Sequence, residues 1–240
     1  MPRAKRTYLP GYIWHLTQRC HDRQFLLKYK QDKKNWLFWI GRASQKYRMT
    51  ILNYMVTSNH IHLIVWDDGK PGTIAKCMHM ASGMTAQQHN SRKQRHGAFW
   101  EDRYHATAVD SDVHLVRCMF YVDLNMVRAG TVNHPKDWLH CGFREIVGHR
   151  HRYRLIERTK LSLLLGIAPD SLAEKYGDWI ENYMKEPHLR RESCWTESLA
   201  VGRKGFLQEF KDRLGPKAKY RALENAGESF ELKEDQAAWD

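Results

Sequence analysis

The order of apolar patterns over residues 12–128 is the feature that most constrains how this chain folds. Segments rich in aromatic and β-branched residues predict strands over residues 12–19, 50–57, 60–66 and 103–109. Helical spacing of apolar residues predicts helices over residues 30–47, 73–94 and 111–128. The first six of these elements follow a split βαβ order, which is typical of a ferredoxin-like antiparallel sheet. We therefore expect an α+β fold with such a sheet and one added helix.

The C-terminal part of the chain has a different pattern. Residues 161–184 and 206–214 have helical spacing and are joined by loops around Pro169 and Pro187. We therefore predict two domains, residues 1–144 and a C-terminal helical appendage of residues 145–240. The appendage is expected to clamp DNA or to regulate the first domain.

Positive charge is concentrated in the first part of the chain. The 240 residues have a formal net charge of +12, and residues 1–100 contain 17 lysines and arginines against 4 aspartates and glutamates. A phosphate backbone is the commonest partner of such a surface, because binding releases condensed counterions. An acidic lipid surface or an acidic protein would also fit the charge alone.

The lack of targeting signals and the spacing of the cysteines indicate where the protein resides. The sequence has no run of about 18 apolar residues that would span a membrane, and no apolar signal core follows its basic N-terminus. The five cysteines are scattered and form no C-x-x-C pair. These features predict a protein of the reducing cytoplasm, without a membrane partner.

His60 and His62 are the first candidate site residues. Side chains alternate along a strand, so both imidazoles lie on one face while Ile61 and Leu63 lie on the other. Two histidines so spaced are able to chelate one divalent ion. With 14 histidines in the chain, however, such a pair also arises by chance.

The helix predicted over residues 111–128 contains the second candidate. At about 100° per residue, one narrow polar stripe collects His114, Arg117, Tyr121, Asn125 and Arg128. A solvated face is the simpler interpretation, although such faces usually carry Glu and Lys. If the helix meets the strand of His60, then His60, His62 and Asn125 would hold one ion. Tyr121 would lie nearby as a nucleophile whose phenol needs the field of Arg117, Arg128 or the ion.

Three segments resemble a known family. Residues 55–64 (MVTSNHIHLI) resemble the HUH motif of single-tyrosine transposases, and residues 120–130 (FYVDLNMVRAG) resemble their nucleophile helix. Residues 99–104 (FWEDRY) are similar to the segment that precedes the last strand in REP-associated tyrosine transposases. Residues 200–206 also resemble that family's extended helical tail. The similarity thus extends over most of the chain.

The resemblance implies a metal-dependent nuclease and strand-transfer enzyme that acts on single-stranded DNA. Tyr121 would attack a DNA phosphate and form a 5′-phosphotyrosine link, with Mg²⁺ or Mn²⁺ held by His60, His62 and Asn125. The implied substrates are hairpins of repetitive extragenic palindromes. The chain departs from the family pattern at Met126, where proline is usual, and at Asn59, where an acidic residue is frequent. Methionine is expected to let the helix continue.

Cationic side chains are expected to contact the DNA, since phosphate contacts position a nucleic acid. The candidates are Arg3, Lys5, Arg6, Arg19, Arg103, Arg117, Arg128, Arg150, Arg152 and Arg154. Two other functions remain open at this point. A domesticated protein would bind hairpins without cutting them, and a zinc hydrolase would use the two histidines but leave Tyr121 without a role. The protein is expected to be a monomer or a homodimer.

Overall fold

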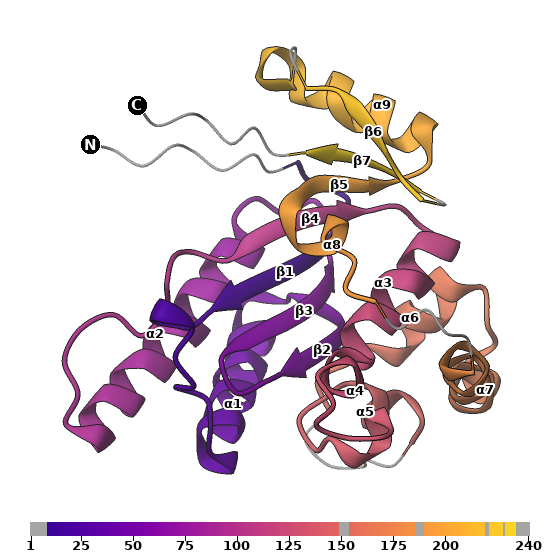
Figure 1. Cartoon of the computed structure of the whole chain (residues 1–240). Coiled ribbons are helices and arrows are strands. Elements are labelled where there is room, and N and C mark those ends of the chain that lie inside the picture. The colour runs from indigo at the N-terminus through magenta and orange to yellow at the C-terminus, as the bar shows by residue number, and fades with distance from the viewer. Residues whose placement is uncertain (1–8, 149–153, 186–189, 219–220, 228, 234–240) are drawn as a thin grey trace.

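A computed structural model of the chain describes residues 9–148, 154–185, 190–218, 221–227 and 229–233 (Figure 1). Its strands are β1 (Ile13–Arg19), β2 (Thr50–Val56), β3 (His60–Trp66), β4 (His105–Val109), β5 (Ser198–Gly202), β6 (Leu223–Ala226) and β7 (Ser229–Lys233). Its longer helices are α1 (Lys30–Tyr47), α2 (Thr73–Lys93), α3 (Val113–Asp123), α6 (Arg158–Leu165), α7 (Leu172–Met184) and α9 (Lys204–Leu214). Three single-turn helices are α4 (Asn125–Arg128), α5 (Phe143–Ile146) and α8 (Cys194–Glu197).

The strands form one sheet in the order β2-β3-β1-β4-β5-β7-β6. The pairs β2–β3, β3–β1 and β1–β4 are antiparallel, and β2-β3-β1-β4 is the strand order of a split βαβ sheet. The predicted α+β fold with a ferredoxin-like sheet is therefore confirmed. The element order predicted over residues 12–128 is confirmed as well.

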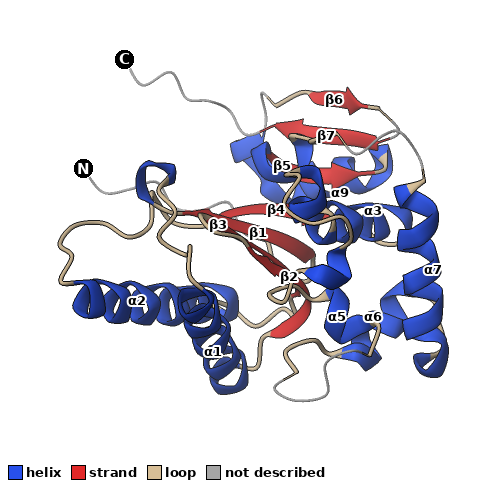
Figure 2. Ribbon diagram, turned by 60° about the horizontal axis from the view of Figure 1, so that its bottom comes forward, coloured by secondary structure: helices blue, strands red, loops and turns tan. Residues whose placement is uncertain are grey.

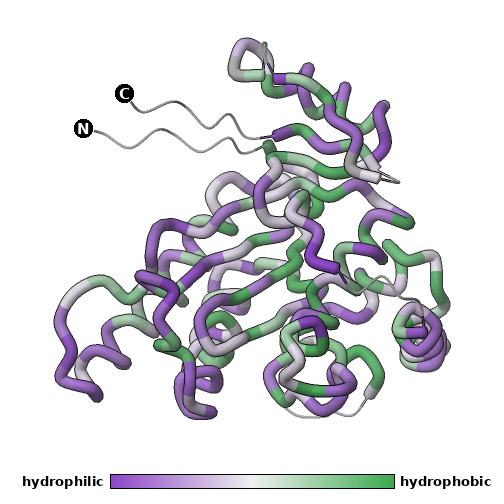
Figure 3. The backbone as a smooth tube through the Cα atoms, viewed as in Figure 1, coloured by the Kyte–Doolittle hydropathy of each residue, from purple (hydrophilic) through white to green (hydrophobic). Residues whose placement is uncertain are grey.

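Helices α1 and α2 lie together on one side of strands β1–β4, and α3 lies on the other side (Figure 2). Ile61, Leu63 and Val65 of β3 are fully buried, as expected for alternate residues of a strand covered by helices. Hydrophobic residues concentrate in the strands and in α3, whereas the outer ends of α1 and α2 are hydrophilic (Figure 3). The two faces of β3 therefore serve different purposes, one packing against α1 and α2 and the other carrying His60 and His62.

The C-terminal segment is not only helical. Helices α6, α7 and α9 confirm the helices predicted there, but residues 198–202, 223–226 and 229–233 form strands instead. The correction includes residues 200–202, which the resemblance assigned to a helical tail. The first of these strands, β5, forms along the edge of β4. The two strands pair in parallel through Ala108–Ala200 and Val109–Val201. The division into domains of residues 1–144 and 145–240 stays a prediction.

The predicted helix over residues 111–128 is interrupted at Leu124, whose φ of −86° and ψ of 6° depart from helical values. The chain then makes one more turn as α4, so Met126 follows a break and does not lie in a continuous helix as expected. Asp123, just before the break, is fully buried and accepts a 2.6 Å hydrogen bond from the Tyr176 hydroxyl of α7. This contact fixes the end of α3 against the C-terminal segment.

All five cysteines lie in the described residues and are free and buried, as the absence of paired spacing predicted. In the described part of the chain, each helix is too short or too polar to cross a membrane.

Candidate active site

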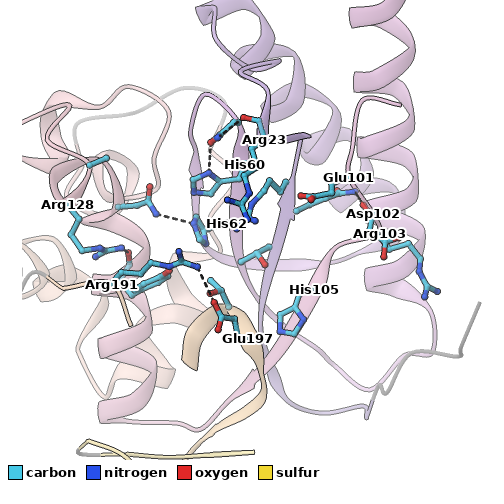
Figure 4. A pocket seen from close by; sticks show the side chains of 18 residues that line it. Arg23, His60, His62, Glu101, Asp102, Arg103, His105, Arg128, Arg191 and Glu197 are labelled. Carbon is cyan, nitrogen blue, oxygen red and sulfur yellow. Dashed lines mark hydrogen bonds and ion pairs between the residues drawn. The ribbon is translucent and has the colours of Figure 1, made fainter. Parts of the chain in front are cut away.

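One cavity of about 810 Å³ gathers seven of the fourteen site residues that the sequence singled out. It opens between β1, β3, α3–α4 and the segment around α8, and most of the residues that line it are polar or charged (Figure 4). The lining includes His60, His62, Tyr121, Asn125 and Arg128. The meeting of the third strand with the added helix, which the sequence only suggested, is therefore a feature of the fold.

His60 and His62 both line this cavity, as strand alternation predicts, with ring centroids 4.9 Å apart. The Nδ1 atom of His60 lies 2.7 Å from Asn59 Oδ1, a hydrogen bond in which the imidazole N–H donates to the amide oxygen. A neutral imidazole that donates from Nδ1 keeps its lone pair at Nε2. Asn59, noted above as a departure from the family pattern, thus orients the neighbouring histidine.

Asn125 extends from α4 toward His62. Its amide nitrogen lies 3.2 Å from His62 Nε2, so the two side chains meet across the gap between helix and strand. Rotation of the amide by half a turn would present its oxygen at the same place, since the two ends of an Asn side chain are nearly isosteric. Two imidazole nitrogens and an amide oxygen form a donor set that suits a divalent ion. In the described residues, here as elsewhere, no three histidine, cysteine or acidic side chains cluster as metal ligands, so the third ligand of such an ion would be the Asn125 amide.

Burial keeps both histidines neutral. Burial, together with the charges of Arg19 and Arg191, lowers the pKa of His60 to about 4. The pKa of His62 is also well below its usual value, chiefly through burial and then through His60 and His15. A metal ligand must be a neutral imidazole, so at pH 7 the two lone pairs are available without the loss of a proton.

Tyr121 of α3 lies beside the histidine pair, with its ring centroid 5.7 Å from that of His62. Its side chain is buried, and burial raises the pKa of its phenol. The charges of Arg128 and Arg191 and a hydrogen bond with the Thr196 side chain act in the opposite direction. A buried phenol surrounded by cations ionises more easily than burial alone would allow.

The predicted DNA-binding cations fall into three groups. Arg19, Arg103 and Arg128 line the cavity, although Arg103 extends away from the histidine pair (Figure 4). Arg117 instead donates hydrogen bonds to Ser229 and Glu192, and Arg154 lines a smaller hollow beside β2. The remaining candidates, Arg3, Lys5, Arg6, Arg150 and Arg152, lie outside the described residues. Their roles stay predictions.

The polar stripe of the helix is not a solvated face. His114 and Tyr121 are buried, and His114 contacts Ser229 of β7. The C-terminal segment therefore covers the first half of the stripe and leaves Tyr121, Asn125 and Arg128 at the cavity.

Several lining residues were missed by the sequence analysis. Arg191, Thr196 and Glu197 come from the segment around α8, and Arg191 pairs with Glu197 at 3.2 Å. His15 of β1 lies directly behind His62, at 3.0 Å. Nothing in the local pattern of these residues indicates a site, because each reaches the cavity through contacts distant in the sequence.

A ferredoxin-like sheet that carries a histidine pair opposite a tyrosine helix is the arrangement that the sequence motifs implied. Residues 9–125 match the model of a family described as IS200-like transposases. This part of the chain, just under half of its length, is therefore similar to the IS200-like transposases, a family of DNA-acting transposases. The match confirms, at the level of the family, the resemblance found in the sequence. No curated protein is significantly similar to the chain.

Two solved structures are similar to the chain. The first is a REP-associated tyrosine transposase bound to a REP hairpin, with 20% identity, a TM-score of 0.48, and coverage of 62% of this chain and 86% of that one. The second is a candidate transposase from Deinococcus radiodurans R1, with 15% identity, a TM-score of 0.35, and coverage of 45% of this chain and 87% of that one. At these values neither neighbour establishes the activity of this chain.

Proposed function

We propose that this protein is a metal-dependent endonuclease and strand-transfer enzyme of single-stranded DNA, acting on palindromic hairpins through a 5′-phosphotyrosine intermediate. The observation that carries the proposal is the convergence of His60, His62, Asn125 and Tyr121 on one cavity. A zinc hydrolase would need the histidines but not a tyrosine among cations. The family match over residues 9–125 supports the DNA-acting part of the proposal.

The proposed reaction is a transesterification at phosphorus. The Tyr121 phenolate oxygen attacks the phosphorus of a DNA phosphodiester, a new O–P bond forms, and the bond from phosphorus to the 3′ oxygen breaks. The phenol loses its proton and the departing 3′ oxygen gains one, which leaves a free 3′-OH and a 5′-phosphotyrosine. Attack by a 3′-OH on this link reverses the step and joins strands.

His60, His62 and Asn125 would hold Mg²⁺ or Mn²⁺, and a bound ion would supply charge neutralisation at the phosphate oxygens. The neutral state of both histidines and the 3.2 Å approach of Asn125 to His62 support this assignment. Arg128 and Arg191 favour the phenolate of Tyr121 through their charge. The metal ligands would thus act on the phosphate through the ion, whereas the two arginines act on the Tyr121 phenol.

The cavity also suits a nucleic acid. Besides Arg128, its lining includes Arg19, Arg23, Arg103 and Arg191. Arginine is well matched to phosphate oxygens because its guanidinium donates two parallel hydrogen bonds. The choice of hairpins as substrate follows from the sequence resemblance. A monomeric or dimeric state and a cytoplasmic location stay predictions.

A covalent-adduct assay tests the proposal. The protein is incubated with a 5′- and 3′-labelled single-stranded hairpin and Mn²⁺, and the products are separated under denaturing conditions. We expect a protein–DNA adduct that carries the label 3′ of the cleavage position, together with a released strand that ends in 3′-OH. Tyr121→Phe should abolish the adduct, and Tyr47→Phe on α1 is the matched control that should retain it.

Two outcomes would contradict the proposal. An adduct formed by Tyr121→Phe would mean that another residue is the nucleophile. Tight hairpin binding by the wild type without adduct under any divalent ion would instead favour the non-cleaving hairpin-binding protein.

A further inference from the structure

His15 is a fully buried histidine of β1 that the proposed reaction does not use. Its ring is stacked against that of His62, with centroids 5.1 Å apart and planes inclined by 9°. Strands β1 and β3 are antiparallel neighbours, so the side chain of one strand is able to support that of the other. His15 is therefore in a position to control the His62 ring.

The partners of His15 fix the direction of its hydrogen bonds. Its Nδ1 atom lies 2.8 Å from the carbonyl oxygen of Trp195, and a carbonyl oxygen only accepts, so Nδ1 carries a hydrogen. Its Nε2 atom lies 3.0 Å from Nδ1 of His62. Both partners of this buried ring are neutral groups, which favours an uncharged imidazole with its lone pair at Nε2.

The same reasoning then applies to His62. If Nε2 of His15 accepts, Nδ1 of His62 donates, and the lone pair of His62 lies at Nε2. That nitrogen is the one that lies 3.2 Å from Asn125. A chain of hydrogen bonds thus runs from the Trp195 carbonyl through His15 to His62 and directs the lone pair of His62 toward the cavity.

We infer that His15, anchored by the Trp195 carbonyl, is a positioning residue that sets the tautomer and ring orientation of His62 for metal binding. The inference rests on the proposed function, since it takes His62 as a ligand. Mutation of a side chain that supports a metal-bound histidine typically weakens metal binding about 10–100-fold. Trp195 belongs to α8, so the C-terminal segment takes part in the site through a backbone atom.

Two measurements on the full-length protein test the inference. In the metal-free wild type, long-range ¹H–¹⁵N NMR of the imidazoles should show both His15 and His62 with hydrogen on Nδ1. In His15→Phe, His62 loses its acceptor, and we expect a population with hydrogen on Nε2. Titration with Mn²⁺, followed by the electron paramagnetic resonance of the free ion, should show about 10–100-fold weaker binding by this variant.

A conservative variant and a matched control separate positioning from folding. His15→Gln keeps an acceptor for His62 and a donor for Trp195, so it should restore much of the Mn²⁺ affinity. His89→Phe removes another buried histidine, on α2 and outside the cavity lining, and should bind Mn²⁺ as the wild type does.

The outcomes distinguish this inference from the proposed function. Equal Mn²⁺ affinity of wild type and His15→Phe, or hydrogen on Nε2 of His62 in the wild type, would overturn the role of His15 alone. Failure of the wild type to bind Mn²⁺ would overturn the proposed metal chemistry and the inference with it.

Discussion

The guanidinium of Arg128 lies over the ring of Tyr121, 4.4 Å from its centroid, and donates a hydrogen bond to the Tyr121 carbonyl oxygen. The break at Leu124 lies between the two residues, and α4 brings Arg128 back toward the ring. The charge of Arg128 opposes the effect of burial on the pKa of Tyr121. Arg128 is therefore one of the groups that favour ionisation of the proposed nucleophile.

Replacement of Arg128 by methionine should slow the cleavage step and move its pH dependence to higher pH. The phenolate loses a nearby stabilising cation, so we expect a lower rate of adduct formation near neutral pH. Single-turnover rates of adduct formation between pH 6 and pH 10 would measure it. Arg42→Met, on the exposed side of α1, is the control. An unshifted profile in Arg128→Met would contradict the assigned role.

Asn125→Leu should bind Mn²⁺ more weakly than the wild type. Loss of a residue that only supports a ligand typically weakens metal binding roughly 10–100-fold, and loss of a ligand should weaken it at least as much. Asn125→Asp should retain affinity, because carboxylate oxygens are good ligands for Mg²⁺ and Mn²⁺. Calorimetric titration of the metal-free protein would show the difference. Unchanged affinity in Asn125→Leu would exclude this residue as the third ligand.

Removal of the metal should separate cleavage from binding. With a chelator present, we expect adduct formation to stop while the hairpin remains bound, since the arginines of the cavity do not depend on the ion. Parallel gel-shift and adduct assays would measure both. Loss of hairpin binding together with cleavage would mean that the ion also holds the DNA.

The buried carboxyl of Asp123 should make the free energy of unfolding depend on pH. Burial raises the pKa of its carboxyl to about 7, above the value near 4 of an unfolded chain. The folded protein therefore holds a proton that the unfolded chain has already released between these values. Its free energy of unfolding should fall as pH rises from about 4 to 7, by up to ~1.4 kcal/mol per pH unit from this group.

Urea unfolding at several pH values would test this contribution. Asp123→Asn still offers Tyr176 an acceptor but no longer titrates, so its stability curve should be flatter across the same window. Asp170→Asn, at an exposed position, is the control and should keep the wild-type slope. A slope unchanged in Asp123→Asn would contradict the prediction.

Gly142 allows a close approach of the chain to β2. A Cβ atom there would overlap the Asn53 side-chain oxygen and come within 3.0 Å of the Tyr54 backbone nitrogen. Gly142→Ala should therefore destabilise the fold by about 1–3 kcal/mol. Gly83→Ala in α2 meets no atom within 4 Å and should stabilise it by roughly 0.5–1 kcal/mol. Thermal unfolding compares the two, and equal midpoints would contradict the packing described.

The sequence determined those features that depend on the geometry of single elements. A period of two along β3 puts His60 and His62 on one face, and a separation of four residues brings Asn125 near Tyr121 despite the break between them. The element order over residues 12–128 was likewise enough to predict the part of the sheet formed by β1–β4. Both kinds of prediction succeed because local periodicity determines on which face of its own helix or strand each side chain lies.

Only the tertiary structure decided which distant groups meet at the site. His15 and His62 are 47 residues apart, and Trp195 reaches His15 over 180 residues. The short strand β5 has no strong pattern of its own and forms because the edge of β4 offers unpaired backbone groups. Such contacts depend on which surfaces the whole chain buries together, and that information is not contained in the spacing of any one segment.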